Sequence, residues 1–517
     1  MPNISFSIDL HCHPNYKPFA RAHKDDGLPP IPQIISPSNK TSLWWYNPPT
    51  LTDKVANYFL GITKFRQHNL TAAAYGRLFV MAAGLGCVEK YFFNNKLGTS
   101  SITDLVDDFV AEFGFPRVNV IEGMTNYWAD FQRELSFIEQ GQQSANPDIN
   151  VVKIDNHYFT YRLAKNFAEL EQNITDNEVK DEEGIIPGET KAHPIVITII
   201  PAVEGLHILN CGLDNACNPD EVKQNALALK QLPHAPWFVT LSHHFYNELC
   251  GHARSLRKMI GKLTDQEYGI NSGFTPLGKE VLDILLDKNF GKRILIDVKH
   301  MSAAGRKEFY EIRRTKYNNE IPIIISHGVC NGLPTYGATI SNYPLLGDTF
   351  TNTVENEIGG DGEFKNHNYI NFYDDEIIEM VNSQGIMGLQ LDERRIANDK
   401  TIKDVKHAWA RHKIMHYRSE LLWKQIQYIA ELLDDNNLYA WGNIAIGSDY
   451  DGLVDPLNSF WTAEQYEDLS GYLERHAYRY LQEKPNRLRN TFNKVNADLV
   501  VQNIFRDNAW NFLRKWF

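Results

Sequence analysis

The sequence predicts a (β/α)8 barrel, and three observations support this fold class. Eight short apolar runs rich in Val and Ile alternate along the chain with amphipathic helical stretches. Such runs are typical of parallel strands buried on both faces, and a repeated strand and helix is the pattern of this barrel. Residues that bind metals or transfer protons follow several of the runs, and such a barrel builds its active site at the C-terminal ends of its strands.

The eight expected strands occur in the order that a closed barrel requires. They are 4–10, 77–85, 194–203, 236–242, 293–298, 321–326, 385–391 and 443–447. Amphipathic helices are expected between them, for example over 275–289, 374–384 and 412–435. An open doubly wound sheet is the competing fold. Its nucleotide-binding version needs a glycine-rich turn after the first strand, where this chain has DLHCHP.

The first expected strand ends in a pair of histidines. His11 and His13 follow Asp9, and residues two apart in an extended segment point the same way. Two imidazoles so placed can reach one metal ion. Because a chain with 18 histidines contains some such pairs by chance, the pair gains weight only from the other strand ends.

Residues of the same chemical types follow later strands. Glu204 follows the third strand, His243 the fourth, Lys299 and His300 the fifth, His327 the sixth and Asp449 the eighth. Imidazole and carboxylate groups suit zinc and similar divalent ions, and one carboxylate can bridge two ions. The strand ends therefore predict a metal-dependent active site.

The chain is longer than the barrel needs, since 517 residues exceed the roughly 250 typical of this fold. We expect one catalytic domain over residues 1–517, with the surplus in insertions at about 14–67, 103–191 and 329–368. The second insertion is expected to be mostly helical and carries the acidic stretch DNEVKDEEG. The first and third should emerge on the catalytic face and form walls of the pocket.

Seven motifs along the chain belong together. They are VEGLH at 203–207, LSH at 241–243, GFTPLGKEVLDIL from Gly273, ILIDVKHMS from Ile294, IIISHG from Ile323, IGSDYDG from Ile446 and NAWNFLRKW from Asn508. In this order they resemble the motifs of the membrane (renal) dipeptidases, a family within the amidohydrolase superfamily of metal-dependent hydrolases. The resemblance covers most of the chain and is clearest over 203–327.

The resemblance implies five metal ligands, two for each of two ions and one shared by both. They are His11 and His13 for the first ion, His300 and His327 for the second, and Glu204 as the bridge. Two divalent ions, with zinc as the expected metal, are thus the implied cofactors. Asp449 corresponds to the catalytic acid or base, and His243 to a substrate-contacting histidine that polarises the scissile carbonyl.

The expected chemistry is hydrolysis of an amide by water. A water shared by two divalent ions loses a proton near neutral pH, because bound metal lowers its pKa from about 15.7 toward about 7. Asp449 would accept a proton and return it to the leaving amine, which requires a carboxylate within hydrogen-bond reach of both. No serine or cysteine nucleophile is needed.

Two residue differences separate the chain from the family pattern. The family typically has aspartate where this chain has His13, although the wider superfamily commonly uses His-x-His there. The family also places a carboxylate-binding arginine just before the helix that here begins FYDDEIIEM, and this chain has NHNYINFYDDE without arginine. Because a buried carboxylate without a partner is costly, we expect either another cation or a different substrate.

Arg394 and Arg395, directly after the seventh strand, are the candidate replacements for that arginine. Either guanidinium could reach the pocket from its own strand end. The alternative is a solvated charge pair, or a salt bridge to Asp392 and Glu393.

Further polar residues near the strand ends have two open roles each. His244 and Asn247 are expected to line the substrate pocket, with hydrogen bonding within their loop as the alternative. Asp9 and Asp297 either support the ligands or bond the backbone at strand ends. For His207 the alternatives are orienting Glu204 or simple burial, and for Asp451 they are supporting Asp449 or capping the next turn.

Composition excludes two classes of partner. The net charge of -12 disfavours nucleic acid, because phosphate binding depends on Lys and Arg. No apolar run reaches the ~20 residues needed to span a bilayer. The chain opens MPNISFSIDL, without the pattern of a signal peptide, so we expect a cytoplasmic location. The resemblance also leads us to expect a homodimer.

We therefore expect a hydrolase that cleaves dipeptides or related small amides. One alternative is another hydrolase of the superfamily, acting on an N-acyl amino acid, a cyclic amide or a lactone, which the missing arginine keeps open. The other is a catalytically silent barrel with a binding or structural role. The presence of all five expected ligands together with Asp449 argues against the second alternative.

Overall fold

A computed structural model describes residues 6–517, apart from 25–28, 61–62, 64, 87, 94–112, 147, 182–183, 257–263, 337–369, 398, 406–409 and 484–486. Most of the third expected insertion, 329–368, therefore lies outside the described residues. Within the part of the chain that is described, no helix combines the length and the apolar composition that crossing a bilayer requires.

Eight parallel strands close into a barrel, as the sequence predicts. Each is hydrogen-bonded to the next barrel strand, and the last pairs with the first between Asp9 and Ile446. The strands are β1 (Ser7–Cys12), β2 (Leu78–Leu85), β5 (Ile195–Glu204), β6 (Phe238–Thr240), β7 (Leu295–Asp297), β8 (Ile324–Gly328), β9 (Ile386–Leu389) and β10 (Ile444–Ile446). Nearly all their residues are buried, as continuous apolar runs require when helices cover the outer face.

A two-stranded hairpin lies in the second insertion and extends the sheet. β3 (Val152–Ile154) and β4 (His157–Leu163) pair antiparallel, and β4 then runs parallel to β5. The expectation that this insertion is mostly helical is therefore wrong for 152–163. Asp155 and Asn156 join the strands, with Asp155 at a φ of +51°. Such two-residue turns favour Asp and Asn because their backbone is left-handed.

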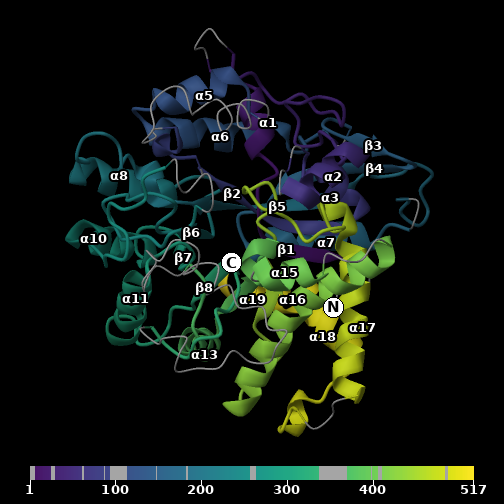
Figure 1. Ribbon diagram of the computed structural model, residues 1–517. Helices are drawn as coiled ribbons and strands as arrows, with labels where there is room; N and C mark the ends of the chain where they lie inside the picture. The colour runs from purple at the N-terminus through teal and green to yellow at the C-terminus, as the bar shows by residue number, and fades with distance from the viewer. Residues whose placement is uncertain are drawn as a thin grey trace.

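Helices follow the strands and surround the barrel (Figure 1). They are α1 (Tyr16–Arg21), α2 (Leu51–Leu60), α3 (Leu70–Tyr75), α5 (Phe115–Glu122), α6 (Tyr127–Gly141), α7 (Phe167–Glu178), α8 (Pro219–Lys230), α10 (Pro276–Leu286), α11 (Ala303–Thr315), α13 (Asp374–Asn382), α14 (Glu393–Ile396), α15 (Asp399–Asp404), α16 (Arg411–Asp435), α17 (Tyr466–Glu483), α18 (Ala497–Gln502) and α19 (Asn508–Trp516). Side chains that accept backbone N–H groups begin several of them, for example Thr275 at α10 and Ser302 at α11.

The C-terminal helix α19 packs against the N-terminal ends of the strands. The ring of Trp510 lies 6.0 Å from that of Phe6, just before β1, and the ring of Phe512 lies 5.8 Å from that of Trp237, just before β6. Edge-to-face aromatic contacts of this kind stabilise a packed core. This end of the barrel is therefore filled with apolar side chains, and the polar residues gather at the other end.

Candidate metal centre

The first candidate cluster gathers four side chains from the ends of β1, β5 and β10. His13 Nε2 is 3.2 Å from Glu204 Oε2 and 3.3 Å from Asp449 Oδ1. His11 Nε2 is 3.3 Å from Glu204 Oε1 and 3.8 Å from Asp449 Oδ1. All four side chains are buried, and their ligand atoms lie within 4.8 Å of one another. The spacing of the two histidines on an extended strand thus brings them to the same pair of carboxylates.

A second cluster shares the same glutamate. His300 Nε2 lies 3.3 Å and His327 Nε2 lies 3.6 Å from Glu204 Oε1. His327 Nε2 is also 3.8 Å from Asp449 Oδ2. All the residues that the sequence predicts as ligands therefore meet around one carboxylate, and a carboxylate between two sets of imidazoles is the arrangement that a pair of metal ions requires.

The donor set fits divalent metal ions. His11 Nε2 and His327 Nε2 are buried and have no hydrogen-bond partner among the described residues, which is costly unless a cation fills the space. Burial holds the pKa of His300 and of His327 well below the ordinary value, so both rings are neutral, the form that binds metals. Burial alone would raise the pKa of Glu204, but the His11 and His243 imidazoles hold it well below its ordinary value.

Two residues of the clusters have a left-handed backbone. The φ angle is +64° at His300 and +59° at Asp449. Non-glycine residues rarely adopt this conformation, and where they do the strain is often found at functional sites. In both cases the chain turns sharply within three residues of the end of a barrel strand, which aims the side chain at the centre of the barrel mouth.

His243 lies between two carboxylates. Its Nδ1 is 2.9 Å from Glu89 Oε2, and its Nε2 is 3.6 Å from Glu204 Oε2. Burial alone would lower the pKa of His243, but Glu204 and Glu89 together raise it above its ordinary value. Burial alone would raise the pKa of Glu89, and His243 lowers it. The two side chains therefore form a buried ion pair beside the clusters.

A glutamine connects Asp449 to a buried lysine. Gln390 Oε1 accepts a hydrogen bond from Lys299 Nζ at 3.3 Å, and Gln390 Nε2 donates one to Asp449 Oδ2 at 2.7 Å. An ammonium only donates and a carboxylate only accepts, so the amide fits between them in one orientation. Gln390 thus fixes one oxygen of Asp449 and leaves the other facing His13.

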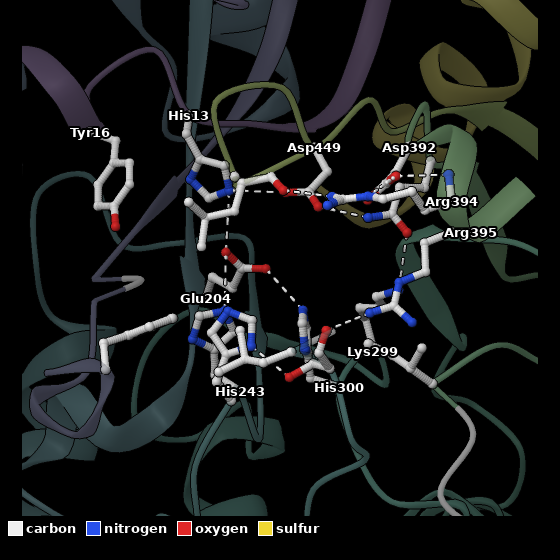
Figure 2. Close-up of a pocket in the computed structure, with 18 residues that line it drawn as sticks. His13, Tyr16, Glu204, His243, Lys299, His300, Asp392, Arg394, Arg395 and Asp449 are labelled. Atoms are coloured by element: carbon white, nitrogen blue, oxygen red, sulfur yellow. Dashed lines mark hydrogen bonds and ion pairs between the residues drawn. The ribbon is translucent and has the colours of Figure 1, made fainter. Parts of the chain in front are cut away.

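One small cavity of about 70 Å³ is lined by seven of these side chains, namely His13, Glu204, His243, Lys299, His300, Gln390 and Asp449. Figure 2 shows His13 and Glu204 on one side of it and Arg395 on the other. Tyr16 belongs to the first insertion and also lines the cavity, as expected for a segment on the catalytic face. The cavity therefore combines a wall of candidate metal ligands with a wall that carries positively charged side chains.

The two arginines after β9 differ in their contacts. Arg394 donates through Nε to Asp392 Oδ1 at 2.8 Å and through Nη2 to Asp392 Oδ2 at 2.7 Å, which is the salt bridge considered as the alternative. Arg395 is 5% exposed, lines the cavity and donates through Nη2 to the carbonyl of Ser255. Both candidates for substrate binding therefore line the cavity, Arg394 beside Asp392 and Arg395 beside the carbonyl of Ser255.

His244 and Asn247, both after β6, differ in whether they line the cavity. His244 lines the cavity, and its Nδ1 is 2.6 Å from Ser255 Oγ. Asn247 is buried and donates to the carbonyl of Leu241 at 2.6 Å, while its Oδ1 accepts the backbone N–H of Leu249 at 3.1 Å. Asn247 is not among the described residues that line the cavity, and its amide makes hydrogen bonds within its loop, which is the alternative expected for it.

Four further polar residues lie near the strand ends and differ in their contacts. Asp9 and Asp297 are buried behind the clusters, where each accepts backbone N–H groups and a serine hydroxyl from a neighbouring strand. His207 is buried and packs edge-on against Tyr127, with the ring centroids 4.8 Å apart. Asp451 accepts the backbone N–H of Gln67 at 2.9 Å, so it holds the loop before α3.

Three residues near the centre received no role from the sequence. Lys299, two residues past β7, is among the polar residues expected at strand ends but has no role there, and Gln390 directly follows β9, where the same rule applies. Glu89 lies in the loop after β2, outside every motif, and no local signal points to it.

Comparisons with known proteins give matches at the level of structure. No protein-family model and no curated protein matches the sequence. A metallopeptidase from Rhodobacter sphaeroides, solved with a phosphinate mimic of the dipeptide L-Ala-D-Ala, is 10% identical, with 99% of each chain covered and a TM-score of 0.49. A structure described as dipeptidase AC, a metallopeptidase, is 10% identical, with 99% of this chain and 98% of that chain covered and a TM-score of 0.49.

A probable dipeptidase from Pseudomonas aeruginosa matches more weakly. It is 13% identical, with 87% of this chain and 90% of that chain covered and a TM-score of 0.41. The assignment of the barrel rests on the strand pairings described above. These three structures are described as a metallopeptidase, a dipeptidase and a probable dipeptidase.

Proposed function

We propose that this protein is a metal-dependent hydrolase that cleaves dipeptides or related small amides at a binuclear centre. The observation that carries the proposal is the position of Glu204. Its carboxylate lies within 3.6 Å of the Nε2 atoms of four predicted histidine ligands, at the C-terminal ends of the barrel strands.

The ligands divide into two sets around this carboxylate. In the proposal His11 and His13 would hold one divalent ion, His300 and His327 would hold the second, and Glu204 would be shared by both. Nitrogen and oxygen donors in this number suit zinc. When bound, two such ions activate a water molecule and polarise the carbonyl of an amide.

Asp449 is the acid and base in this proposal. Gln390 donates to its Oδ2 at 2.7 Å, and its Oδ1 lies 3.3 Å from His13 Nε2, so the carboxylate faces the clusters. From this position it can accept a proton from the attacking water and deliver it to the leaving amine. A neutral amide at this position could not accept that proton.

Other residues of the cavity position the substrate. His243 presents its Nε2 edge to the cavity and donates a hydrogen bond to the scissile carbonyl. Arg395 and Lys299 supply positive charge to a substrate carboxylate, replacing the arginine that the sequence lacks after His327. Charge-assisted hydrogen bonds from such groups are short and strong, which favours substrates with a free carboxylate.

A second substrate class remains within the same mechanism. The segment before α13 contains no arginine, and that is the position from which the membrane dipeptidases bind the substrate carboxylate. An N-acyl amino acid, a cyclic amide or a lactone is therefore the alternative substrate, with the same ligands and the same Asp449.

The experiment that tests the proposal measures metal content and hydrolysis together. The purified protein is analysed for bound metal and assayed against L-Xaa-L-Xaa and L-Xaa-D-Xaa dipeptides, N-acyl amino acids and lactones, with Asp449→Asn as the control. We expect two metal ions per chain and dipeptide hydrolysis that the Asn variant loses by at least about 100-fold. Two ions with hydrolysis of another substrate class only would favour the alternative, and a protein that binds no metal would refute the proposal.

A further inference from the structure

Glu89 is a buried carboxylate outside the metal clusters that contacts the segment after β6. It lies four residues past β2 and is 2% exposed. Its Oε1 accepts the backbone N–H of Phe245 at 3.0 Å, and its Oε2 accepts that of His244 at 3.3 Å. The same Oε2 is 2.9 Å from Nδ1 of His243. Both oxygens are therefore directed at residues 243–245.

These contacts determine which edge of the His243 ring faces the cavity. A carboxylate only accepts hydrogen bonds, so the Nδ1 beside it carries a hydrogen, and in the ion pair with Glu89 the Nε2 carries one as well. With Nδ1 turned to Glu89, the opposite Nε2 lies 3.6 Å from Glu204 Oε2 in the cavity. A carboxylate that fixes an imidazole in this way sets its tautomer and orientation in many metal sites and catalytic triads.

We propose that Glu89 is a positioning residue that keeps the Nε2 edge of His243 turned into the cavity. The inference rests on the proposed function, in which His243 contacts the substrate carbonyl. Glu89 is not one of the described residues that line the cavity, so it acts through His243 and through the backbone of the loop. Without the carboxylate the ring is free to turn its other edge toward the cavity.

Asp434 offers a matched control at a site remote from the cavity. It is 1% exposed, lies near the end of α16 and accepts the backbone N–H groups of Arg489 and Asn490. A third donor is Asn493 Nδ2 at 2.8 Å. Glu89→Gln and Asp434→Asn each remove one buried charge that binds two consecutive backbone N–H groups. A merely structural role predicts the same consequences for both variants.

The first measurement is the imidazole proton of His243 in metal-free protein. A hydrogen-bonded imidazole N–H gives a proton resonance far downfield, which we expect in the wild type and not in His243→Asn. Glu89→Gln should lose or shift this resonance, and Asp434→Asn should keep it. A wild type without the resonance, or a Glu89→Gln variant that retains it unshifted, would overturn the inference. If Glu89→Gln does not fold, the wild type and His243→Asn still test the inference, because a wild type without the His243 resonance overturns it.

The second measurement is the kinetics of the same variants loaded with zinc. Glu89→Gln should lower kcat about 10- to 100-fold, with KM within about twofold of the wild type and metal content unchanged. Asp434→Asn should lower the unfolding temperature and leave kcat unchanged. A Glu89→Gln variant with wild-type kcat would overturn the inference. Because the proton resonance is read without metal, the inference and the proposed function can fail separately.

Discussion

Two pairs of neighbouring strands, β1 with β10 and β7 with β8, support the candidate metal centre through the same arrangement of aspartate and serine. Within β1, Asp9 accepts hydrogen bonds from Ser448 N at 2.9 Å and Ser448 Oγ at 2.6 Å. It also accepts the backbone N–H of His11 at 3.1 Å and the hydroxyl of Tyr466 at 2.5 Å. Four donors thus meet one buried carboxylate between the first strand and the last.

The pair β7 and β8 repeats this arrangement. Asp297 accepts hydrogen bonds from Ser326 N at 2.9 Å and Ser326 Oγ at 2.6 Å. It also accepts the backbone N–H of Lys299 at 3.1 Å and the hydroxyl of Thr240 at 2.7 Å. Each arrangement is next to two residues of the clusters around Glu204. On one side these are His11 and Asp449, and on the other they are His300 and His327.

The two arrangements differ in what the serine contacts next. Ser326 Oγ lies 2.9 Å from Nδ1 of His327, a predicted metal ligand. Ser448 Oγ instead accepts the backbone N–H of Tyr450 at 3.1 Å. The β7–β8 pair therefore orients an imidazole directly, whereas the β1–β10 pair fixes backbone. We therefore expect these similar hydrogen bonds to serve stability on both sides and metal affinity mainly on the β7–β8 side.

The largest expected effect is a loss of stability that is the same on both sides. Asp9→Ala and Asp297→Ala each leave four buried donors without their acceptor, so we expect each to lower the free energy of unfolding by about 3 kcal/mol. Denaturant unfolding of the metal-free protein measures it, with the exposed Asp148→Ala as the control. A loss on one side only would show that the two arrangements are not equivalent.

The second effect should separate the two sides. Ser326→Ala removes the hydroxyl beside Nδ1 of His327 and is expected to weaken zinc binding about 10-fold, because such contacts orient a ligand. Ser448→Ala touches no ligand side chain and should change zinc affinity by less than about twofold. Titration against a competing chelator measures both. Equal losses would contradict the difference between the pairs.

Much of this centre could be predicted because local sequence determines it. An apolar run predicts a strand, and in a (β/α)8 barrel the active site lies at the C-terminal ends of the strands. The polar residues that directly follow each apolar run can therefore be identified from the sequence. His11, His300, His327 and Asp449 were therefore found from the sequence, with the family resemblance supplying their roles. The serine and aspartate partners behind them also lie at strand ends, so their burial there is no surprise.

The remaining features depend on how loops fold over the barrel. Glu89 contacts His243 only because the loop after β2 packs against the loop after β6. The two residues are 154 positions apart in the sequence. The hairpin β3–β4 was missed because its insertion is acidic and was interpreted as helix, although the Asp155–Asn156 turn marked it. Arg394 and Arg395 are adjacent in the sequence and both line the cavity, and only the fold shows that Arg394 lies beside Asp392 and Arg395 beside the carbonyl of Ser255.

The smallest expected effect is a difference between two aspartates, Asp451 and Asp297, in how their contribution to stability changes at low pH. Asp451, after β10, lies 3.0 Å from Lys17 Nζ and 3.1 Å from Arg66 Nε. Burial alone would raise the pKa of Asp451, but Lys17 and Arg66 hold it below its ordinary value. On the other side, burial raises the pKa of Asp297 despite its hydrogen bonds. The two groups therefore respond to acid in opposite directions.

The direction follows from which state binds the proton more tightly. For Asp451 the unfolded chain binds the proton more tightly. Its stabilising contribution is therefore fully present above the unfolded pKa of about 3.9 and is lost as the pH falls through its lower pKa in the folded state. For Asp297 the folded state does, so lowering the pH through its folded pKa relieves the cost of its buried charge. We expect the gap in unfolding temperature between the wild type and Asp451→Asn to narrow from pH 6 to pH 3. The difference in unfolding temperature between the wild type and Asp297→Asn should not narrow over the same range. If the unfolding temperatures of the two variants changed with pH in parallel, the opposite pKa shifts of Asp451 and Asp297 would be contradicted.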